Sequence, residues 1–190
     1  MDLDLRILIV EDEPDAAALI EDKLREAGLR FSARHVGTKE EFLNTLKEFE
    51  PNLVLSDFTL RRFNGLDILR LTREMAPLVP VIIFTGSIDE ETAVECMKAG
   101  AADYVLKQHL ARLVPAVQGA LEKQRSRREK ERVERALQQS ERRYRDLVQN
   151  ARDIIFTLSA EGNITSLNPA FERLTDWFPA EWLDKPFFGL

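Results

Sequence analysis

Five short apolar runs alternate with amphipathic stretches between residues 5 and 114, and this alternation limits the possible fold more than any other feature of the chain. Three of the runs, at 6–10, 52–56 and 81–84, are almost wholly apolar, as strands covered by helices on both faces should be. Strands that alternate with helices form parallel sheets with crossover helices. The pattern therefore predicts an α/β fold built on a doubly wound, five-stranded parallel sheet.

The remaining elements of this sheet can be placed in the same way. Runs 30–36 and 103–106 complete it, and the more polar run 30–36 is expected to be an edge strand. Helices are predicted over 15–27, 38–49, 66–75 and 90–99. Gly28 and Gly100 follow two of these helices as C-caps, whereas Pro51 and Pro77 follow the other two.

A long helix is predicted from Leu110 to Asn150. Its residues 122–132 include no apolar side chain, so we expect that this stretch does not pack on a domain core. Beyond it, apolar or small residues recur at spacings of four and three, the period of a coiled-coil seam. This spacing predicts a parallel homodimer held mainly by residues 133–151; the competing interpretation is a monomer with a mobile tail past residue 121. The seam consists of Val133, Leu137, Ser140, Tyr144, Leu147 and Ala151.

Residues 153–190 predict a small α+β segment. A strand is expected over 153–159, a turn over 160–163, a second strand over 164–167 and a helix over 169–175, with Asn168 as its N-cap.

Composition and charge exclude several classes of protein. The chain is 44% apolar and its longest apolar run is five residues, whereas a membrane span needs about 20 and a signal-peptide core at least about 7. We therefore expect a cytoplasmic location and no membrane contact in these residues. The net charge is −6, and the basic stretch 122–146 is mixed in sign, so a nucleic-acid partner is not expected. Cys96 is the only cysteine, which rules out an internal disulfide.

Charged and polar side chains stand directly after four of the predicted strands. Glu11, Asp12 and Glu13 follow the first strand, Asp57 the third and Lys107 the fifth, while Thr85 ends the fourth. Ligands of open parallel sheets bind at this edge. Clustered carboxylates require a neutralising cation, and oxygen ligands favour Mg²⁺. Helix caps or a surface lysine would explain each residue alone, but not their joint arrival at four strand ends.

Glycine spacing excludes other kinds of phosphate site. Phosphate-cradling loops need close glycine pairs, and the nearest two glycines, Gly28 and Gly37, are nine residues apart. The sequence therefore contains neither a P-loop nor a dinucleotide-binding fingerprint.

Four segments together resemble the receiver domain of bacterial response regulators over residues 5 to about 121. The resemblance implies a flavodoxin-like sheet of order 2-1-3-4-5, and it implies that Asp57 accepts a phosphoryl group from a histidine kinase or a phosphotransfer protein. The segments are Ile9-Val10-Glu11-Asp12-Glu13-Pro14, Leu55-Ser56-Asp57-Phe58-Thr59-Leu60, Phe84-Thr85-Gly86-Ser87 and Asp103-Tyr104-Val105-Leu106-Lys107.

The same resemblance implies roles for the neighbouring residues. Mg²⁺ would be held by Glu11, Asp12, Asp57 and the backbone carbonyl of Thr59. Thr85 and Lys107 would bind the phosphoryl oxygens, and Tyr104 would be an aromatic switch. The sequence departs from the family pattern at Glu11, where Asp is usual, and at Arg61 and Gln108, where proline is common.

A second resemblance covers residues 141–190, which look like the opening of a PAS sensor domain. It rests on the segments 140–151, 153–156 and Ile164-Thr165-Ser166-Leu167-Asn168-Pro169-Ala170-Phe171. Residues 122–140 would then form a linker, or signalling, helix between a receiver domain over 1–121 and a partial PAS domain. The order resembles multidomain sensor histidine kinases, so we interpret the chain as a fragment of one, although it contains no kinase catalytic domain. A receiver–PAS diguanylate cyclase, or a pseudo-receiver that only scaffolds dimers, are the alternatives.

Overall fold

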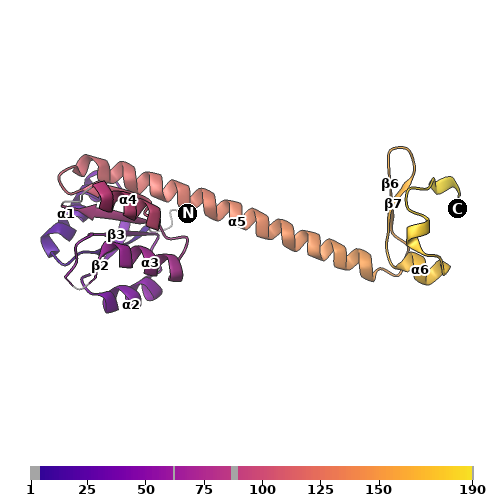
Figure 1. Cartoon of the computed structure of the whole chain (residues 1–190), viewed down its shortest axis with the longest axis horizontal. Coiled ribbons are helices and arrows are strands. Elements are labelled where there is room, and N and C mark those ends of the chain that lie inside the picture. The colour runs from indigo at the N-terminus through magenta and orange to yellow at the C-terminus, as the bar shows by residue number, and fades with distance from the viewer. Residues whose placement is uncertain (1–4, 62, 87–89, 190) are drawn as a thin grey trace. The chain divides into compact units, whose positions relative to one another are not determined.

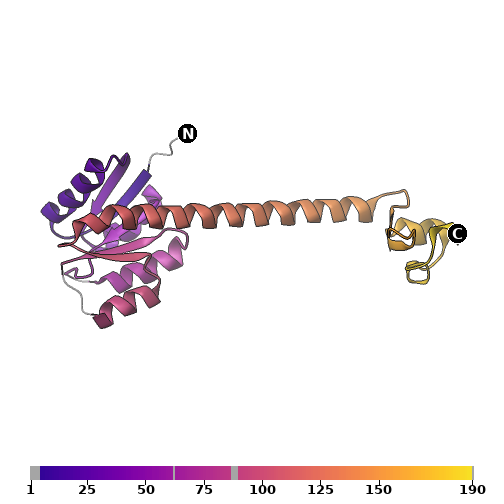
Figure 2. The ribbon, with the colours of Figure 1, turned by 90° about the horizontal axis from the view of Figure 1, so that it is seen from above.

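The computed structural model describes residues 5–61, 63–86 and 90–189. Ser87, which belongs to one of the four receiver-like segments, lies outside the described residues. The chain divides into two compact units, with the division between Glu129 and Lys130. Helix α5, Leu113–Asn150, contributes to both units and is unbroken over 38 residues (Figure 2).

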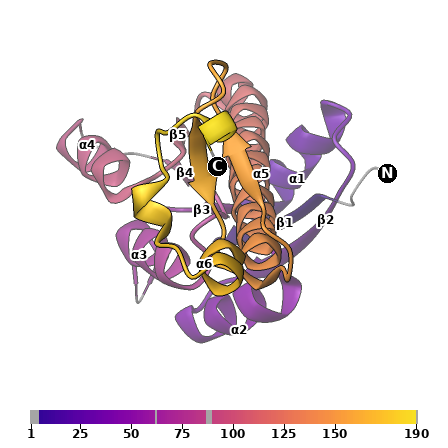
Figure 3. The same cartoon turned by 90° about the vertical axis from the view of Figure 1, so that its right-hand side faces the viewer.

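A five-stranded parallel sheet forms the centre of the first unit (Figure 3). The strand order is β2-β1-β3-β4-β5, and every neighbouring pair is parallel. This confirms the predicted fold class and strand order, including the edge position of the most polar strand. The strands are β1 Leu5–Val10, β2 Phe31–Val36, β3 Leu53–Ser56, β4 Val81–Thr85 and β5 Asp103–Leu106.

Helices cover both faces of this sheet (Figure 1). Successive side chains of a strand point to opposite faces, so Ile7 and Ile9 of β1 pack against α1 and α5, whereas Leu8 and Val10 pack on the side of α2, α3 and α4. All four side chains are fully buried. The helices of this unit are α1 Pro14–Glu26, α2 Lys39–Phe49, α3 Gly65–Met75, α4 Glu90–Ala99 and the 3₁₀ turn η1 Leu110–Arg112.

The starts of the helices show which polar residues have structural roles. Thr38 and Glu41 form a capping box at α2, and Asn64 and Asp67 form one at α3. At α1 the N-cap is Glu13, with no side-chain capping bond among the described residues. The acidic residues after β1 are therefore not explained by helix capping.

The first turns of α5 hold it to the sheet through the buried side chains of Leu113, Val117 and Ala120. Gln124 is also buried, and its Nε2 donates a hydrogen bond of 2.8 Å to the carbonyl oxygen of Leu78. The prediction that residues 122–132 do not pack on a domain core is thus wrong at Gln124. The sequence does not reveal this contact, because a hydrogen bond between polar groups leaves no pattern of apolar residues.

The second unit has a two-stranded antiparallel sheet and one short helix beside its part of α5. The first strand is shorter than the predicted range 153–159, and Asn168 is not the N-cap of the helix. Pro169 takes that position, while the buried amide of Asn168 bonds to backbone groups of α5 and of the segment before the sheet. The elements are β6 Phe156–Leu158, β7 Ile164–Leu167, α6 Ala170–Thr175 and the 3₁₀ turns η2 Pro179–Glu181 and η3 Phe187–Gly189.

No helix in the described part of the chain is long and apolar enough to cross a membrane.

Candidate functional site

Backbone hydrogen bonds continue past the ends of the strands and hold the predicted site residues at one edge of the sheet. The amide of Asp57 donates to the carbonyl of Val10 at 2.9 Å, and the amide of Lys107 donates to that of Thr85 at 2.7 Å. The amide of Glu11 donates to the carbonyl of Val36 at 3.0 Å. The backbones of Glu11, Asp57 and Lys107 are therefore each held in place by a hydrogen bond to the neighbouring strand.

Glu11, Asp57 and Lys107 form one ion-pair cluster at this edge, which we name the carboxylate–lysine cluster. The Lys107 Nζ lies 2.7 Å from Glu11 Oε2 and 2.7 Å from Asp57 Oδ2. The side chains of Glu11 and Asp57 are only 1% and 10% exposed. One ammonium thus neutralises part of the charge of two buried carboxylates.

The electrostatic state of the cluster follows from burial and from these contacts. Burial is the largest influence on Glu11 and raises its pKa above the ordinary 4.5, although Lys107 opposes this. Burial lowers the pKa of Lys107, but its bonds to Asp57 and Glu11 together outweigh that effect and raise the pKa above 10.5. Lys107 is therefore a cation at neutral pH.

Backbone groups orient the carboxylates that Lys107 joins. The backbone amide of Thr59 donates to Asp57 Oδ1 at 3.2 Å, and that of Glu13 donates to Glu11 Oε1 at 3.3 Å. The Ser56 hydroxyl donates to the backbone carbonyl of Asp57 at 2.7 Å. Each oxygen of the Asp57 carboxylate therefore has a hydrogen-bond donor, Thr59 for Oδ1 and Lys107 for Oδ2, and these bonds fix the orientation of the group.

Asp12 has a cation of its own, which sequence reasoning did not anticipate. Its Oδ2 lies 3.0 Å from Nε of Arg61, and the Arg61 side chain is 83% exposed. In the sequence, Arg61 is notable only as a departure from the family pattern. The peptide bond between Lys107 and Gln108 is trans, since the described residues contain no cis bond.

Thr85 and Tyr104 lie on β4 and β5. Thr85 is buried at the end of β4, next to the backbone of Lys107. Tyr104 is half-buried, and the guanidinium carbon of Arg112 lies 5.9 Å from its ring centre. With Leu106 and residues of α4, Tyr104 lines a surface pocket of about 700 Å³. Tyr104 therefore belongs to the α4–β5 surface, not to the carboxylate–lysine cluster.

The oxygen atoms at this edge suit a hard divalent ion. Glu11, Asp12 and Asp57 carry carboxylates and Thr59 carries a backbone carbonyl, and these are the ligand types that Mg²⁺ takes. Among the described residues, no three His, Cys, Asp or Glu side chains are grouped as a ready-made metal site. Lys107 and Arg61 balance the acidic charge in this arrangement. The donor chemistry fits Mg²⁺, and its binding stays a prediction.

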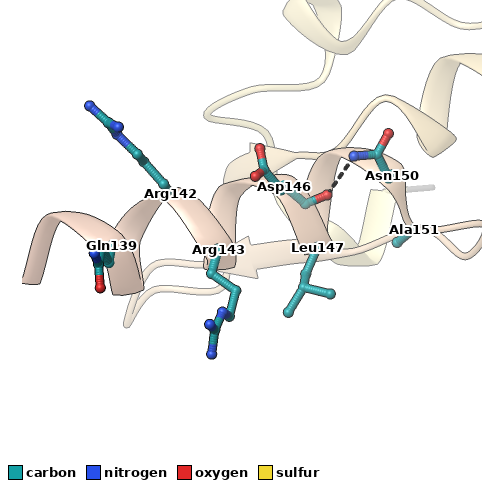
Figure 4. A pocket seen from close by; sticks show the side chains of 7 residues that line it. All are labelled: Gln139, Arg142, Arg143, Asp146, Leu147, Asn150 and Ala151. Carbon is teal, nitrogen blue, oxygen red and sulfur yellow. Dashed lines mark hydrogen bonds between the residues drawn. The ribbon is translucent and has the colours of Figure 1, made fainter. Parts of the chain in front are cut away.

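The predicted seam of α5 is exposed in the second unit. Val133, Leu137, Tyr144 and Leu147 are 55% to 67% exposed, while Ala151 lies one residue past the end of the helix. Figure 4 shows the side chains of Arg143 and Leu147 on one side of the helix and those of Arg142 and Asp146 on the other.

Family models match two parts of the chain. The response regulator receiver domain matches residues 7–118, and the PAS fold matches residues 142–190.

Known proteins are similar to the first of these parts. The nitrogen assimilation regulatory protein NtrX of Azorhizobium caulinodans is 39% identical over 126 residues, which are 65% of this chain and 27% of NtrX. The DNA-binding response regulator MtrA of Mycolicibacterium smegmatis is 35% identical over 102 residues, which are 54% of this chain and 43% of MtrA. The chain therefore spans less than half the length of these relatives.

Solved structures agree with this similarity. NtrX from Brucella abortus superimposes with a TM-score of 0.62 at 29% identity, covering 69% of this chain and 30% of that one. The signal receiver domain of a LuxO repressor protein from Vibrio parahaemolyticus gives a TM-score of 0.60 at 25% identity, covering 66% and 95%. Since the receiver model alone covers more than half of the residues, this chain belongs to the response regulator receiver domain family of two-component systems, with a PAS-fold segment after the receiver domain.

Proposed function

We propose that the first unit accepts a phosphoryl group on Asp57 from a histidine kinase or a phosphotransfer protein. The observation that carries this proposal is the position of Lys107, whose Nζ is 2.7 Å from both Asp57 Oδ2 and Glu11 Oε2. A buried carboxylate beside a fixed ammonium is suited to take a phosphoryl group, because the cation stays in place to balance the charge that arrives.

The transfer itself needs few groups from the protein. A carboxylate oxygen of Asp57 attacks the phosphorus of a phosphohistidine, and a P–O bond forms as the P–N bond breaks. The electron pair of that bond leaves with the imidazole nitrogen of the donor protein. The Lys107 ammonium and the Thr85 hydroxyl then bind phosphoryl oxygens, and the backbone amide of Thr59 keeps the carboxylate oriented.

Mg²⁺ is the cofactor proposed for this reaction, held by Glu11, Asp12, Asp57 and the Thr59 carbonyl. When bound, it would neutralise charge on the transferring oxygens. Arg61 competes for Asp12, so we expect Arg61→Ala to raise Mg²⁺ affinity by up to about fivefold, because exposed ion pairs contribute ~0.2–1 kcal/mol. Calorimetry would measure this, with Asp12→Ala as the variant expected to lose binding.

The proposed switch links the phosphoryl site to the α4–β5 surface. A phosphoryl group on Asp57 gives Thr85 new acceptors, and a shift of Thr85 toward them would leave space for the Tyr104 ring. Tyr104 borders an open pocket on α4, so its ring is not tightly enclosed on that side. A surface that can pack in two ways has two conformations, and phosphorylation can shift the equilibrium between them.

The proposed assembly is a homodimer through α5. Its support is the exposure of Val133, Leu137, Tyr144 and Leu147, which recur at coiled-coil spacing. Analytical ultracentrifugation should show a dimer for the full chain and a monomer for Leu137→Glu with Leu147→Glu. Gln138→Glu with Gln149→Glu adds the same charge off the seam and should leave the dimer intact. A monomeric wild type, or a dimer in both variants, would contradict the seam.

For the whole protein we propose a sensor histidine kinase, because the receiver–PAS order resembles that class. A diguanylate cyclase is the alternative. The relatives above match through the receiver part and are regulatory proteins by name, so they favour neither. The full reading frame distinguishes the two, since a kinase carries a phosphoacceptor histidine and an ATP-binding domain.

Mass spectrometry after incubation with a small phosphodonor and Mg²⁺ tests the central proposal. The chain should gain one phosphoryl group, EDTA should prevent this, and Asp57→Asn should abolish it. Asp22→Asn, an exposed carboxylate on α1, is the matched control and should label like the wild type. Lys107→Ala and Thr85→Ala should weaken labelling or the conformational response. Equal labelling of the wild type and Asp57→Asn would refute the site, and an unlabelled wild type would favour a pseudo-receiver.

A further inference from the structure

A pocket lies at the end of the sheet where β4 begins, whereas the carboxylate–lysine cluster lies where β4 ends. It is a pocket of about 410 Å³ between α3, α4 and α5, all within the first unit. We name it the α3–α4–α5 pocket. Apolar side chains of Leu69, Pro77, Val79 and Val81 line part of it.

Three cations also line the pocket, one from each helix. They are Arg73 of α3, Lys98 of α4 and Arg127 of α5, and no carboxylate is among the lining residues that the structure describes. Within this described part, neither Arg73 nor Lys98 is in an ion pair. Like charges placed around one hollow raise its positive potential and attract an anion.

Helix ends explain only part of this arrangement. Arg73 and Lys98 stand in the last turns of α3 and α4, where a cation interacts favourably with the free carbonyls. Arg127 lies well inside α5, so this explanation does not apply to it. Its presence beside the other two makes the pocket cationic from three sides.

We propose that the α3–α4–α5 pocket binds a small organic phosphate of nucleotide size. The cations would hold the phosphate oxygens, while the body of the ligand would rest on the apolar wall. Ligand pockets for small molecules usually have volumes of about 300–1,000 Å³, and this one falls within that range. A small soluble molecule fits a hollow of this kind better than a bilayer does, because a bilayer surface cannot enter it.

The position of Arg127 connects this site to the linker helix. Arg127 follows Gln124 by three residues and therefore shares its side of α5. Gln124 is hydrogen-bonded to the Leu78 carbonyl, just before the boundary of the first unit at Glu129. A phosphate that bridges Arg127 to Arg73 and Lys98 adds a second tie at the same place. Bound ligand should therefore slow amide hydrogen exchange in α5 around residues 120–130.

Calorimetry on the full chain tests this proposal, with ADP and inorganic pyrophosphate as probes. EDTA keeps divalent ions away from the carboxylates, and ionic strength is held constant. The variant combines Arg73→Gln, Lys98→Gln and Arg127→Gln. The control removes three exposed cations elsewhere, by Lys47→Gln, Arg70→Gln and Arg128→Gln. We expect the pocket variant to bind ADP roughly tenfold more weakly or worse, because charge-assisted hydrogen bonds to phosphate are lost, and the control to bind like the wild type.

Several outcomes would overturn the proposal. One is an equal loss of ADP affinity in both triple variants, and another is a wild type that does not bind ADP. A third is a wild type that binds pyrophosphate as tightly as ADP, because the apolar wall would then have no role. Binding to phosphatidylglycerol vesicles but not to ADP would replace the soluble ligand by a lipid headgroup. The single change Arg127→Gln, at an exposed helical position, tests the site if the triple variant fails to fold. Phosphorylation of Asp57 should be unaffected in every variant, so the two proposals fail independently.

Discussion

The two units of this chain are stabilised in different ways. The first unit has two clusters of buried aliphatic and aromatic side chains, one on each face of its sheet. In the described part of the second unit only four residues are buried, and one of them is polar: Ile164, Asn168, Ala170 and Phe171. The first unit therefore contains a complete core, whereas the second holds its short strands with few apolar contacts.

The aromatic side chains of the second unit show the same contrast. Trp177 and Trp182 stack at 4.8 Å between ring centres, and Phe156 and Phe187 stack at 4.9 Å. Trp177 is nevertheless 45% exposed and Phe156 is 38% exposed. These rings pair with each other and stay open to solvent on one side. Folding stability should consequently be unequal along the chain.

The largest expected difference is in amide hydrogen exchange. Amides of β3 and β4 should exchange only by global unfolding of the first unit, since both strands are covered on both faces. Amides of β6 and β7 lie in a two-stranded sheet and should exchange orders of magnitude faster, because such sheets are marginal alone. Mass spectrometry of exchanged peptides measures this, and equal protection in both sheets would contradict the comparison.

A smaller but still large difference is expected from removing one phenylalanine ring in each unit. Phe84→Ala empties a fully buried site in β4 and should lower the free energy of unfolding of the first unit by about 3–5 kcal/mol. Phe171→Ala removes the most buried ring of the second unit and should leave the unfolding transition of the first unit unchanged. Thermal unfolding followed by circular dichroism would show the two effects. A shared shift would mean that the units unfold together.

Asn168→Ala should have a moderate effect confined to the second unit. The Asn168 amide accepts from the Ile155 amide at 2.9 Å and donates to the carbonyls of Val148 and Asp153 at 3.0 Å. Its loss leaves buried groups without partners, at a cost of about 1–3 kcal/mol. Exchange in β6 and β7 should therefore accelerate. Asn150→Ala, which removes an exposed side-chain hydrogen bond, is the matched control and should change little.

The strand order was implied by the family resemblance, whereas the gathering of the charged residues at one edge of the sheet could be predicted for a physical reason. Parallel strands of an open sheet end at the same edge, so Glu11, Asp57 and Lys107 were expected at one edge once the strands were assigned. Apolar runs identify such buried strands directly. The 2.7 Å contacts of Lys107 with both carboxylates could not be predicted, because they depend on side-chain positions across three strands.

The contacts that the sequence did not reveal are polar and join distant segments. Gln124 and Asn168 are both buried by hydrogen bonds to backbone groups, and neither bond produces a period in hydropathy. Arg61 reaches Asp12 across 49 positions in the sequence, from a loop whose course no local pattern determines. Asn before a helix predicts an N-cap, but at Asn168 bonds to three separate backbone groups replaced that local role.

The smallest expected difference between the units is in how their stability depends on pH in the acidic range. The pKa of Glu11 is raised, chiefly by burial. The contribution of Glu11 to folding stability is therefore fully present below pH 4.5 and is lost as the pH rises through the folded-state pKa. In the second unit the Ser159 hydroxyl lowers the pKa of Glu161 by hydrogen bonding. Its contribution has the opposite sign, because it is present above 4.5 and is lost as the pH falls through the folded-state pKa.

Carbon-13 NMR of the two side-chain carboxyls during an acid titration tests this difference. Glu11 should titrate above 4.5 and Glu161 below it. Glu11→Gln should flatten the pH dependence of unfolding of the first unit just above 4.5, because a buried amide carries no proton to lose. Glu161→Gln should affect only the second unit, and weakly, since Glu161 is solvent-exposed and water screens its charge. If Glu11 titrates below 4.5, its contacts with Lys107 and with the Glu13 amide outweigh the cost of burying the carboxylate. The charges of the carboxylate–lysine cluster would then stabilise the first unit at neutral pH.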